Sequence, residues 1–311
     1  MKRLIVVVPF LLCCLLLGQQ PAWATEGGAS YYLPGAPVTF ATAMAPPPGF
    51  MGLNQMVFMN LRGNKAVLGG RVSFDLKAQP FFDYVGGLYT LDKAANARTT
   101  WQLGAFVPVG HAYVKSSLSS AVGSASRSDA STDIGDALLM AAMYWKNGDW
   151  NYKLVESIYV PTGGYKLNYP ANVGRNYWGF DTTLVMTWLN MKTGTEVSIA
   201  PGFLINTTNS ATDYRSGTEF HIDLAVNRHY FAKHYAVGIH AYYYRQISGD
   251  SGSGARLGSF NGEALGVGPA FLWTPPAGKG RCSIIAKWMF DVSHTNRLHG
   301  DYGQLIISYK F

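Results

Sequence analysis

Apolar and polar residues alternate with a period of two along much of this chain. In the stretch FHIDLAVN (220–227) every second residue is a large apolar one, and the residues between them are polar or small. The stretches 235–244 and 282–291 repeat the pattern. Successive side chains of a β-strand point to opposite faces, whereas an amphipathic helix spaces its apolar residues three and four apart. The pattern therefore predicts β-strands with one apolar and one polar face.

Turn signals divide these segments into about twelve strands. Short breaks that carry Asn, Asp, Gly or Pro alternate with longer polar stretches. The short breaks are 146–150, 190–194 and 275–280, and the long ones are 115–132, 161–176, 207–217, 248–259 and 293–301. The predicted strands are 49–61, 72–90, 98–114, 133–145, 150–160, 177–189, 195–206, 218–228, 234–247, 261–273, 281–292 and 303–311. Alternating short turns and long loops are typical of an outer-membrane barrel, and an even strand number puts both of its ends on the periplasmic side.

The composition also favours a membrane protein built from strands. Hydrophobic residues make up 48% of the chain and charged residues 14%, against about 25% charged in typical globular domains. Beyond the N-terminal segment no run of 18 apolar residues occurs, so helical membrane spans are not expected. The sequence predicts an all-β fold, an antiparallel transmembrane β-barrel in the outer membrane of a Gram-negative bacterium. The last strand, 303–311, is expected to pair with the first and close the barrel.

The first 48 residues differ from the rest of the chain. Lys2 and Arg3 precede an apolar run, and residues 22–24 form an A-x-A cleavage site, so residues 1–24 are expected to be a cleaved signal peptide. Residues 25–48 are rich in Gly and Pro and contain a PPP run that cannot join a β-ladder. We expect an N-terminal extension that either enters the lumen as a partial plug or hangs in the periplasm. The barrel itself is expected to cover residues 49–311.

Several motifs occur in an order that resembles one protein family. TEGGASYYLPG follows the signal peptide, PPPGF precedes the first strand, and IGDALLMAAMYWKNGDW, VPTGGY, GRNYWGFD and INTTNSATDYRSGTEFHID come after it. The chain ends on FDVSHTNRLHGDYGQLIISYKF. Together these motifs resemble the outer-membrane protein family of the phenol meta-cleavage pathway, called "MetA-pathway of phenol degradation". The resemblance implies a barrel that passes hydrophobic or aromatic compounds across the outer membrane.

Ionisable and aromatic residues on the polar face make up the candidate site. A charged side chain on the lipid face costs about 2–4 kcal/mol at mid-depth, so these residues are expected to face the lumen. The candidates for the lumen and substrate path are Asp136, Asp181, Glu219, His221, Asp223, His240, Tyr242, Tyr244, Gln246 and Lys287. Such residues can fill the lumen or stack with a passing aromatic solute. In the external loops Arg175, Asp213 and Arg215 are expected to pair and fold over the mouth, as a selective entrance or as loop bracing.

Two kinds of chemistry compete with transport. An outer-membrane phospholipase would place a Ser two residues after its His, but Asn296 stands two residues after His294, and Thr295 would point to the opposite face of a strand. His221 and His240 are expected to join a hydrogen-bond network rather than bind a metal, because no ligand spacing surrounds them. No enzymatic activity, metal or cofactor is therefore predicted.

The sequence as a whole predicts an outer-membrane channel for passive uptake of small hydrophobic or aromatic compounds. The alternatives are a lipase-type barrel enzyme that uses the His294 region, and a structural or adhesive barrel with a closed lumen. The formal net charge of +7, which falls to +5 without Lys2 and Arg3, is not concentrated in a basic run, so no nucleic-acid binding is expected. The expected partners are outer-membrane lipid and lipopolysaccharide, the solute, and the barrel-assembly machinery, which would read the C-terminal strand ending on Phe311.

Overall fold

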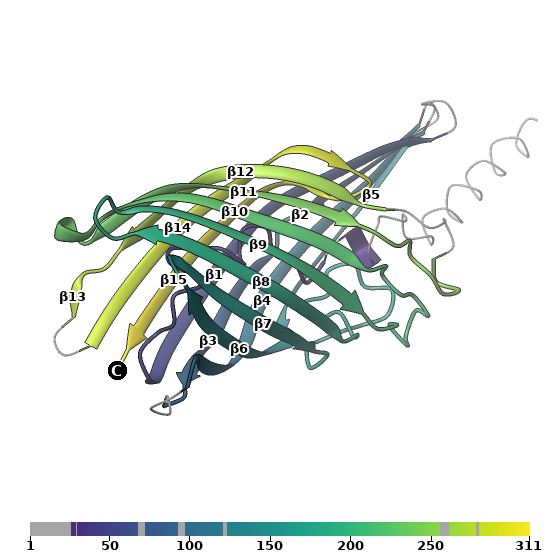
Figure 1. Ribbon diagram of the computed structural model, residues 1–311. Coiled ribbons are helices and arrows are strands. Elements are labelled where there is room, and N and C mark those ends of the chain that lie inside the picture. Colours follow the sequence, from purple (N-terminus) through teal and green to yellow (C-terminus); the bar gives the residue numbers. More distant parts are fainter. Residues whose placement is uncertain are drawn as a thin grey trace, which may run out of the picture.

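The chain folds into a closed antiparallel β-barrel of twelve strands, as the sequence predicts (Figure 1). The computed structural model describes residues 26–28, 30–67, 72–92, 97–120, 123–255, 261–277 and 280–311. The predicted signal peptide, residues 1–24, lies outside the described residues. Neither helix in the described part of the chain is long and apolar enough to cross a membrane.

Fifteen β elements and two short 3-10 helices make up the described structure. The strands are β1 (Gly49–Val67), β2 (Val72–Ala78), β3 (Phe81–Thr90), β4 (Thr99–Ser120), β5 (Gly123–Ile134), β6 (Ala137–Asn147), β7 (Trp150–Val160), β8 (Gly179–Asn190), β9 (Thr195–Asn206), β10 (Glu219–Tyr230), β11 (Tyr235–Gln246), β12 (Glu263–Trp273), β13 (Pro276–Ala277), β14 (Gly280–Thr295) and β15 (His299–Lys310). The helices are η1 (Glu26–Gly28) and η2 (Phe231–Lys233). The tiny β13 belongs to the turn between β12 and β14.

The last strand closes the barrel against the first, which confirms the predicted seam. β15 pairs with β1 in an unbroken antiparallel register from Met51 opposite Lys310 to Arg62 opposite His299. Closure satisfies the backbone groups of both strands, which would otherwise form an exposed sheet edge. The barrel therefore has a turn end, where β1 begins and β15 ends, and a loop end opposite it. In barrels of this type the turn end faces the periplasm.

Two of the twelve barrel strands are each interrupted once. The predicted strand 72–90 breaks at Gln79 and Pro80, because Pro80 has no N–H to donate to the neighbouring strand. The fourth barrel strand breaks between Ile134 and Ala137, where it changes from pairing with the outer half of β4 to pairing with its inner half. At this break the amide of Gly135 donates to the carbonyl of Pro108 at 2.8 Å.

The Ser-rich stretch 115–132, which the sequence predicted to be a polar loop, is mostly strand. β4 continues to Ser120 and β5 begins at Gly123, and the two pair along their length from Val109 opposite Ile134 to Ser120 opposite Gly123. With the outer parts of β1 and β2 they form an arm that projects beyond the rest of the loop end (Figure 1). The prediction was wrong because it looked for one apolar face. Both faces of the arm lie outside the membrane, so its side chains need not alternate.

A second predicted loop, 293–301, is also largely strand. β14 runs to Thr295 and β15 starts at His299, so the connection is a tight turn of three residues. A β-bulge on β14, opposite Leu265 and Gly266 of β12, precedes this turn. Bulges of this kind add local twist near the rim of a barrel, which is where this one occurs.

Side chains of the barrel strands alternate between lipid and lumen as predicted. Val226 and Ile239 are 58% and 65% exposed on the outer surface, while their strand neighbours Ala225 and His240 are buried. The buried side chains of the polar face therefore point into the barrel. The exposed side chains of the apolar face form the surface that contacts lipid.

Asp83 and Glu156 break the expected rule that charges face inward. Asp83 is two residues before the exposed Val85 on β3, and Glu156 is two residues after the exposed Leu154 on β7, so both face outward. Each has a polar partner on the neighbouring strand. Asn54 donates to Asp83, and Thr182 Oγ1 donates to Glu156 Oε2 at 2.5 Å. These hydrogen bonds offset part of the cost of a polar group at the lipid surface.

Candidate functional site

The described part of the N-terminal extension, residues 26–28 and 30–48, runs within the barrel from the loop end to the turn end. Residues 26–48 are called the plug below. At the loop end the amide of Glu26 donates to Ser216 Oγ at 3.1 Å, and at the turn end the amide of Ala41 donates to Glu196 Oε2 at 2.9 Å. Glu196 is at the start of β9, whereas Ser216 is in the loop that follows β9. The plug therefore spans the length of the lumen, which decides between the two locations that the sequence left open.

Small side chains on the inner wall make room for the plug. Val38 is fully buried in a cluster with Ala200 and Ala225, which come from β9 and β10. Phe40 packs in a second cluster with Ala236 of β11. Barrels of about eight strands are narrow enough for inward side chains to fill them, and a barrel of twelve strands is wider. Here the plug fills part of the wider lumen, beside small wall residues at Val38 and beside large ones such as Tyr242 at Tyr32.

Asp223 is the main acceptor for the middle of the plug. Its two carboxylate oxygens accept hydrogen bonds from the hydroxyl of Tyr32 at 3.0 Å and from the amide of Gly35 at 2.9 Å. The ring of Tyr32 stacks on the imidazole of His221, with the ring centroids 4.3 Å apart. Hydrogen bonds to an ionised acceptor are stronger than neutral ones, so Asp223 fixes the plug in register with β10.

Lys287 of β14 and Gln304 of β15 hold the same part of the plug. The Lys287 ammonium group, which is buried, donates to the carbonyl of Gly35 and, at 2.6 Å, to the carbonyl of Val38. Gln304 Nε2 donates to the carbonyl of Pro34 at 2.9 Å. These backbone carbonyls have no partner in a β-ladder, so the two side chains satisfy groups that would otherwise be buried without a hydrogen bond.

The two inward histidines belong to hydrogen-bond networks. His221 Nε2 lies 3.2 Å from Asp181 Oδ2, and His240 Nε2 lies 3.0 Å from Asn227 Oδ1. Asn227 Nδ2 in turn donates to the carbonyl of Thr39 in the plug at 3.0 Å. Within the described residues no group of three His, Cys, Asp or Glu side chains is placed to hold a metal ion. Through Asn227, the hydrogen-bond network of the wall is therefore continuous with the plug.

Near the loop end the plug is held by charged groups. The hydroxyl of Tyr31 donates to Asp136 Oδ2 at 2.7 Å, and Arg175 Nη2 donates to the carbonyl of Ser30 at 2.8 Å. The Arg175 guanidinium also lies 5.1 Å from the centre of the Tyr31 ring, a cation–π distance. Ser30 Oγ donates to Glu219, the first residue of β10. Four contacts thus fix two plug residues to three parts of the barrel.

Glu26 links the start of the plug to an external loop. Its carboxylate accepts hydrogen bonds from Thr212 Oγ1 at 2.7 Å and from Asn209 Nδ2 at 2.9 Å. Burial raises the pKa of Glu26 above its usual value, and these two hydrogen bonds only partly oppose the effect. Glu26 is therefore a titratable group at the contact between plug and loop.

All ten residues predicted to line the lumen are buried inside the barrel. They are Asp136, Asp181, Glu219, His221, Asp223, His240, Tyr242, Tyr244, Gln246 and Lys287. Asp136, Glu219, Asp223 and Lys287 contact the plug directly. Their use as a substrate path stays a prediction, because in this arrangement the plug occupies the space beside them.

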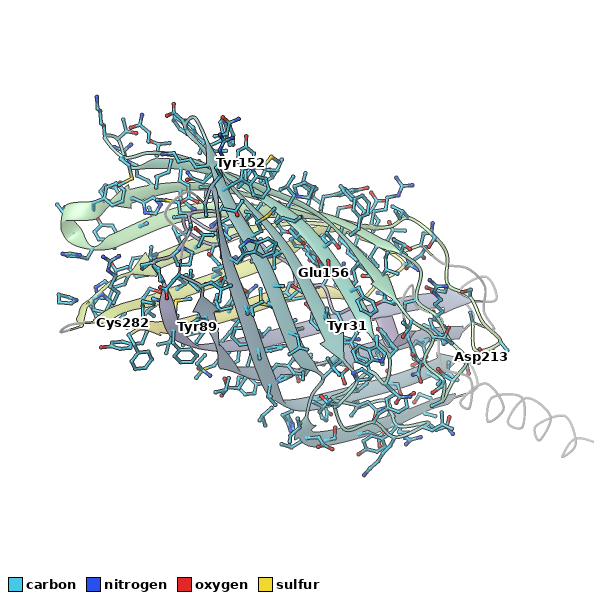
Figure 2. All side chains as sticks on the ribbon, turned by 60° about the horizontal axis from the view of Figure 1, so that its bottom comes forward. Tyr31, Tyr89, Tyr152, Glu156, Asp213 and Cys282 are labelled. Atoms are coloured by element: carbon cyan, nitrogen blue, oxygen red, sulfur yellow. The ribbon has the colours of Figure 1, made fainter. Side chains whose placement is uncertain are left out.

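The contacts of the three predicted loop residues go to different partners. Arg175 binds the plug, as described above. Asp213, at the tip of the loop end in Figure 2, accepts a hydrogen bond from the amide of Ser253 at 2.9 Å, and hydrogen bonds from Ser253 hold the pKa of Asp213 below its usual value. Arg215 Nε donates to the carbonyl of Asn206 at 3.1 Å. Asp213 and Arg215 therefore brace the loops, while Arg175 connects a loop to the plug.

Sequence reasoning missed Glu196, which holds the turn end of the plug. It is fully buried, accepts the amide of Ala41, and lies 2.6 Å from His229 Nε2. Glu196 stands two and four residues before Ser198 and Ala200 on one face of β9, so alternation could have placed it inside. The plug residues Tyr31 and Tyr32 carried no such periodic signal.

The region of His294 shows a ring contact rather than an arrangement for nucleophilic catalysis. The imidazole of His294 stacks on that of His299, with centroids 3.6 Å apart. Both residues lie where β14 and β15 approach their short connection, and His294 is exposed. Thr295 is the next residue of the same strand, so its hydroxyl points to the other face.

Comparisons with known proteins agree with this architecture. The family model described as "Putative MetA-pathway of phenol degradation" matches residues 60–306. The structure is similar to the COG4313 outer membrane channel from Pseudomonas putida F1, with a TM-score of 0.67, 14% sequence identity, and coverage of 88% of this chain and 98% of that one. Lower scores are found for the translocator domain of autotransporter NalP from Neisseria meningitidis (0.44, 13% identity, 86% and 90% covered) and for a FadL homologue from Pseudomonas aeruginosa (0.39, 8% identity, 94% and 98% covered). The comparison with curated proteins gives no match.

Proposed function

The chain belongs to the MetA-pathway of phenol degradation family and has the fold of an outer-membrane channel, and from this premise we propose that it is a passive transporter for small hydrophobic or aromatic compounds. In this proposal the plug closes the lumen at rest and moves aside to let a solute pass. No energy source is needed, because the solute moves down its own gradient.

The observation that carries the proposal is the separation of plug and wall. The plug is not a strand of the sheet, and hydrogen bonds and packing hold it to Asp223, Lys287 and Glu196. Beside Val38 the wall carries the small residues Ala200 and Ala225, whereas Tyr32 packs among large wall residues such as Tyr242 and Met289. A purely structural barrel could close its lumen with large wall side chains at lower entropic cost. Because the plug is not part of the sheet, it can leave the lumen without breaking the wall, and this supports a gated path.

Aromatic groups along the plugged region favour an aromatic solute. Tyr242 and Tyr244 are buried on the inner face of β11, and the ring of Tyr244 lies 5.8 Å from that of Tyr32 in the plug. If Tyr32 leaves with the plug, its position beside Tyr244 and His221 is free for another ring. Aromatic pairs contribute about 0.5–1.5 kcal/mol beyond their buried area, which suits weak and reversible binding during passage.

A disulfide that locks the plug tests the proposal. A β-carbon built on Gly35 lies 3.1 Å from Met289 Cγ, a spacing compatible with a disulfide between cysteines at the two positions. In a Cys282→Ser background, cells that express Gly35→Cys/Met289→Cys are expected to exclude the aromatic dye 1-N-phenylnaphthylamine until a reductant is added. A variant without residues 26–46 is expected to admit the dye with or without reductant.

The controls separate gating from strain and from a closed barrel. Gly35 has a φ of +77°, which favours glycine, so the single variant Gly35→Cys measures the effect of strain alone. Dye entry that is equally low in all variants, including the one without the plug, would show a sealed structural barrel. Entry of small sugars through the unplugged barrel at the same rate as the dye would refute the preference for aromatic compounds.

A further inference from the structure

Three cationic residues stand directly opposite one another on three adjacent strands near the loop end. In the antiparallel register Arg62 of β1 is opposite Lys77 of β2, and Lys77 is opposite Lys115 of β4. Directly opposite residues project from the same face of a sheet, with β-carbons about 4.5–5.5 Å apart. These three residues, called the cation row below, therefore form one line across the strands. His299 of β15 continues the line on the other side of Arg62.

The cation row lies on the outer surface of the barrel. Phe58, four residues before Arg62 on β1, is 42% exposed on the lipid-facing side, and even spacing keeps Arg62 on that side. The neighbours Leu61 and Ala78 are buried inside. Arg62 and Lys115 are themselves exposed. The row thus faces the surroundings of the barrel and takes no part in the lumen.

The height of the row corresponds to the lipid headgroups. Phe58 pairs with Phe81, and their rings lie 5.0 Å apart at the upper edge of the apolar surface. Four residues separate Phe58 from Arg62, and four separate Phe81 from Lys77. At about 3.3 Å per residue this is about 13 Å along the strand, or about 10 Å along the membrane normal for a strand tilted by 35–45°. An aromatic pair followed by cations is typical of a membrane interface.

The protein does not neutralise these charges by ion pairs. In the part of the chain that the structure describes, no carboxylate lies within 4.0 Å of Arg62, Lys77 or Lys115. Two acids share the outer face near the row. Asp75 is two residues beyond Lys77 on β2, and Asp301, which is two residues below His299, accepts a hydrogen bond from Asn60. Like charges directly opposite one another destabilise a sheet, so the row favours an anion supplied from outside the protein.

We propose that the cation row binds the phosphorylated glycolipid headgroup of the outer leaflet, that is, the lipid A part of lipopolysaccharide. The loop end of such barrels faces the cell exterior, where the outer leaflet consists of lipopolysaccharide, and the row stands beyond the aromatic pair that marks the membrane interface. Guanidinium and ammonium groups are the side chains that proteins use for phosphate, and basic clusters beside a membrane bind anionic headgroups. The row is continuous over three strands, so one headgroup can contact all three cations. The bound lipid would fasten β1, β2 and β4 together where the arm leaves the membrane.

Lipopolysaccharide retained by the purified protein tests the proposal. The full-length protein and its triple variant Arg62→Gln/Lys77→Gln/Lys115→Gln are extracted from outer membranes, and the lipopolysaccharide per barrel is measured by native mass spectrometry. The wild-type protein is expected to retain lipid A phosphate stoichiometrically, whereas the triple variant loses it. Binding of added lipid A to the variant is expected to be about 100-fold weaker, because each surface cation contributes about fivefold. Phosphatidylglycerol, which carries a phosphate but no sugar, is expected not to replace it.

A matched control removes equal charge from the other end of the barrel. Lys192, Arg228 and Lys233 border a depression at the turn end, and their triple Gln variant has the same net charge as the cation-row variant. It is expected to retain lipopolysaccharide as the wild type does. Equal retention by all three proteins would overturn the proposal, as would equal loss from both variants, which would show a response to net charge alone. Equal binding of phosphatidylglycerol and lipid A would also overturn the assignment to glycolipid. Heat-modifiable migration of each variant on a gel shows that the barrel is folded.

Discussion

At the scale of single residues, a few buried charges hold the plug in place. Asp223 of β10 and Lys287 of β14 both bind the backbone of the plug at Gly35. The Asp223 carboxylate accepts a hydrogen bond from a backbone N–H group of the plug, and the Lys287 ammonium group donates hydrogen bonds to its backbone carbonyls. A buried charge that loses its partner costs several kcal/mol, and this makes the docked position of the plug sensitive to either side chain.

Replacement of Lys287 by Met is expected to loosen the plug. The change leaves the carbonyls of Gly35 and Val38 without their charged donor. A hydrogen bond to a charged group contributes about 1.5–3 kcal/mol, so the fraction of undocked plug is expected to rise at least about tenfold. Uptake of the aromatic dye by intact cells measures this fraction. Lys146→Gln, which removes an exposed charge near the end of β6, serves as the control, and equal uptake by the two variants would contradict the assigned role.

Glu26 is expected to make the outer contact of the plug sensitive to pH. Burial raises the pKa of its carboxyl above the usual value, so the docked state binds the proton more tightly than the undocked state. This contribution to docking is fully present below the ordinary pKa of glutamate and is lost as the pH rises through the raised pKa. Dye uptake by the wild type is therefore expected to increase with pH over that range. Glu26→Gln keeps an oxygen acceptor for Thr212 but cannot ionise, so its profile should be flat.

At the scale of elements, the arm, whose longest hairpin is formed by β4 and β5, is separate from the membrane barrel. β5 pairs with β4 and lies off the main path of the sheet, and its residues are mostly exposed. The membrane part of the wall begins below it, where β6 takes over the pairing with β4. The arm therefore contributes pairing to its own strands and little to the closure of the barrel.

Shortening of the arm is expected to leave the barrel intact. Residues 117–126 can be replaced by Asn-Gly between Ser116 and Arg127, which are opposite each other in the register. Because the removed part packs on nothing inside the membrane, heat-modifiable migration and the thermal unfolding midpoint should match those of the wild type. A barrel that fails to refold after this change would show that the hairpin nucleates the wall.

At the scale of the whole molecule, the C-terminus takes part in the closure of the barrel. The amide of Phe311 donates to the carbonyl of Phe50 at 3.2 Å, and the two rings stack with centroids 5.9 Å apart. The Phe311 side chain is nevertheless 76% exposed at the turn end. A side chain this exposed is accessible to another protein, and we propose that the barrel-assembly machinery recognises it.

Phe311→Ala is expected to reduce assembly more than stability. The mostly exposed ring stabilises the folded barrel only slightly, so protein refolded in detergent should unfold at nearly the wild-type temperature. The amount of folded protein in outer-membrane fractions of cells should fall severalfold at equal synthesis. Tyr309→Ala, a change on the same face two residues earlier, is the comparison. An equal loss of assembly in both variants would argue against a specific signal at the last residue.

Most of the barrel could be predicted from local pattern, because lipid and lumen impose opposite chemistry on alternate residues. That rule alone places His221, His240 and Lys287 inside the barrel. It failed for the Ser-rich arm, where both faces meet water and no pattern is imposed. It also failed for Asp83 and Glu156, because hydrogen bonds from Asn54 and Thr182 across the strands reduce the cost of facing lipid.

The sequence by itself determined the strand number, the compartment and the side of the wall on which most residues lie, since each follows from the period of two and the thickness of the membrane. Only the tertiary structure decided that the Gly- and Pro-rich extension fills the lumen. The plug has no periodicity, and its position rests on hydrogen bonds to Asp223 and Lys287, which lie about 190 and 250 residues farther along the chain. The cation row likewise depends on register, because Arg62, Lys77 and Lys115 meet only when three strands align.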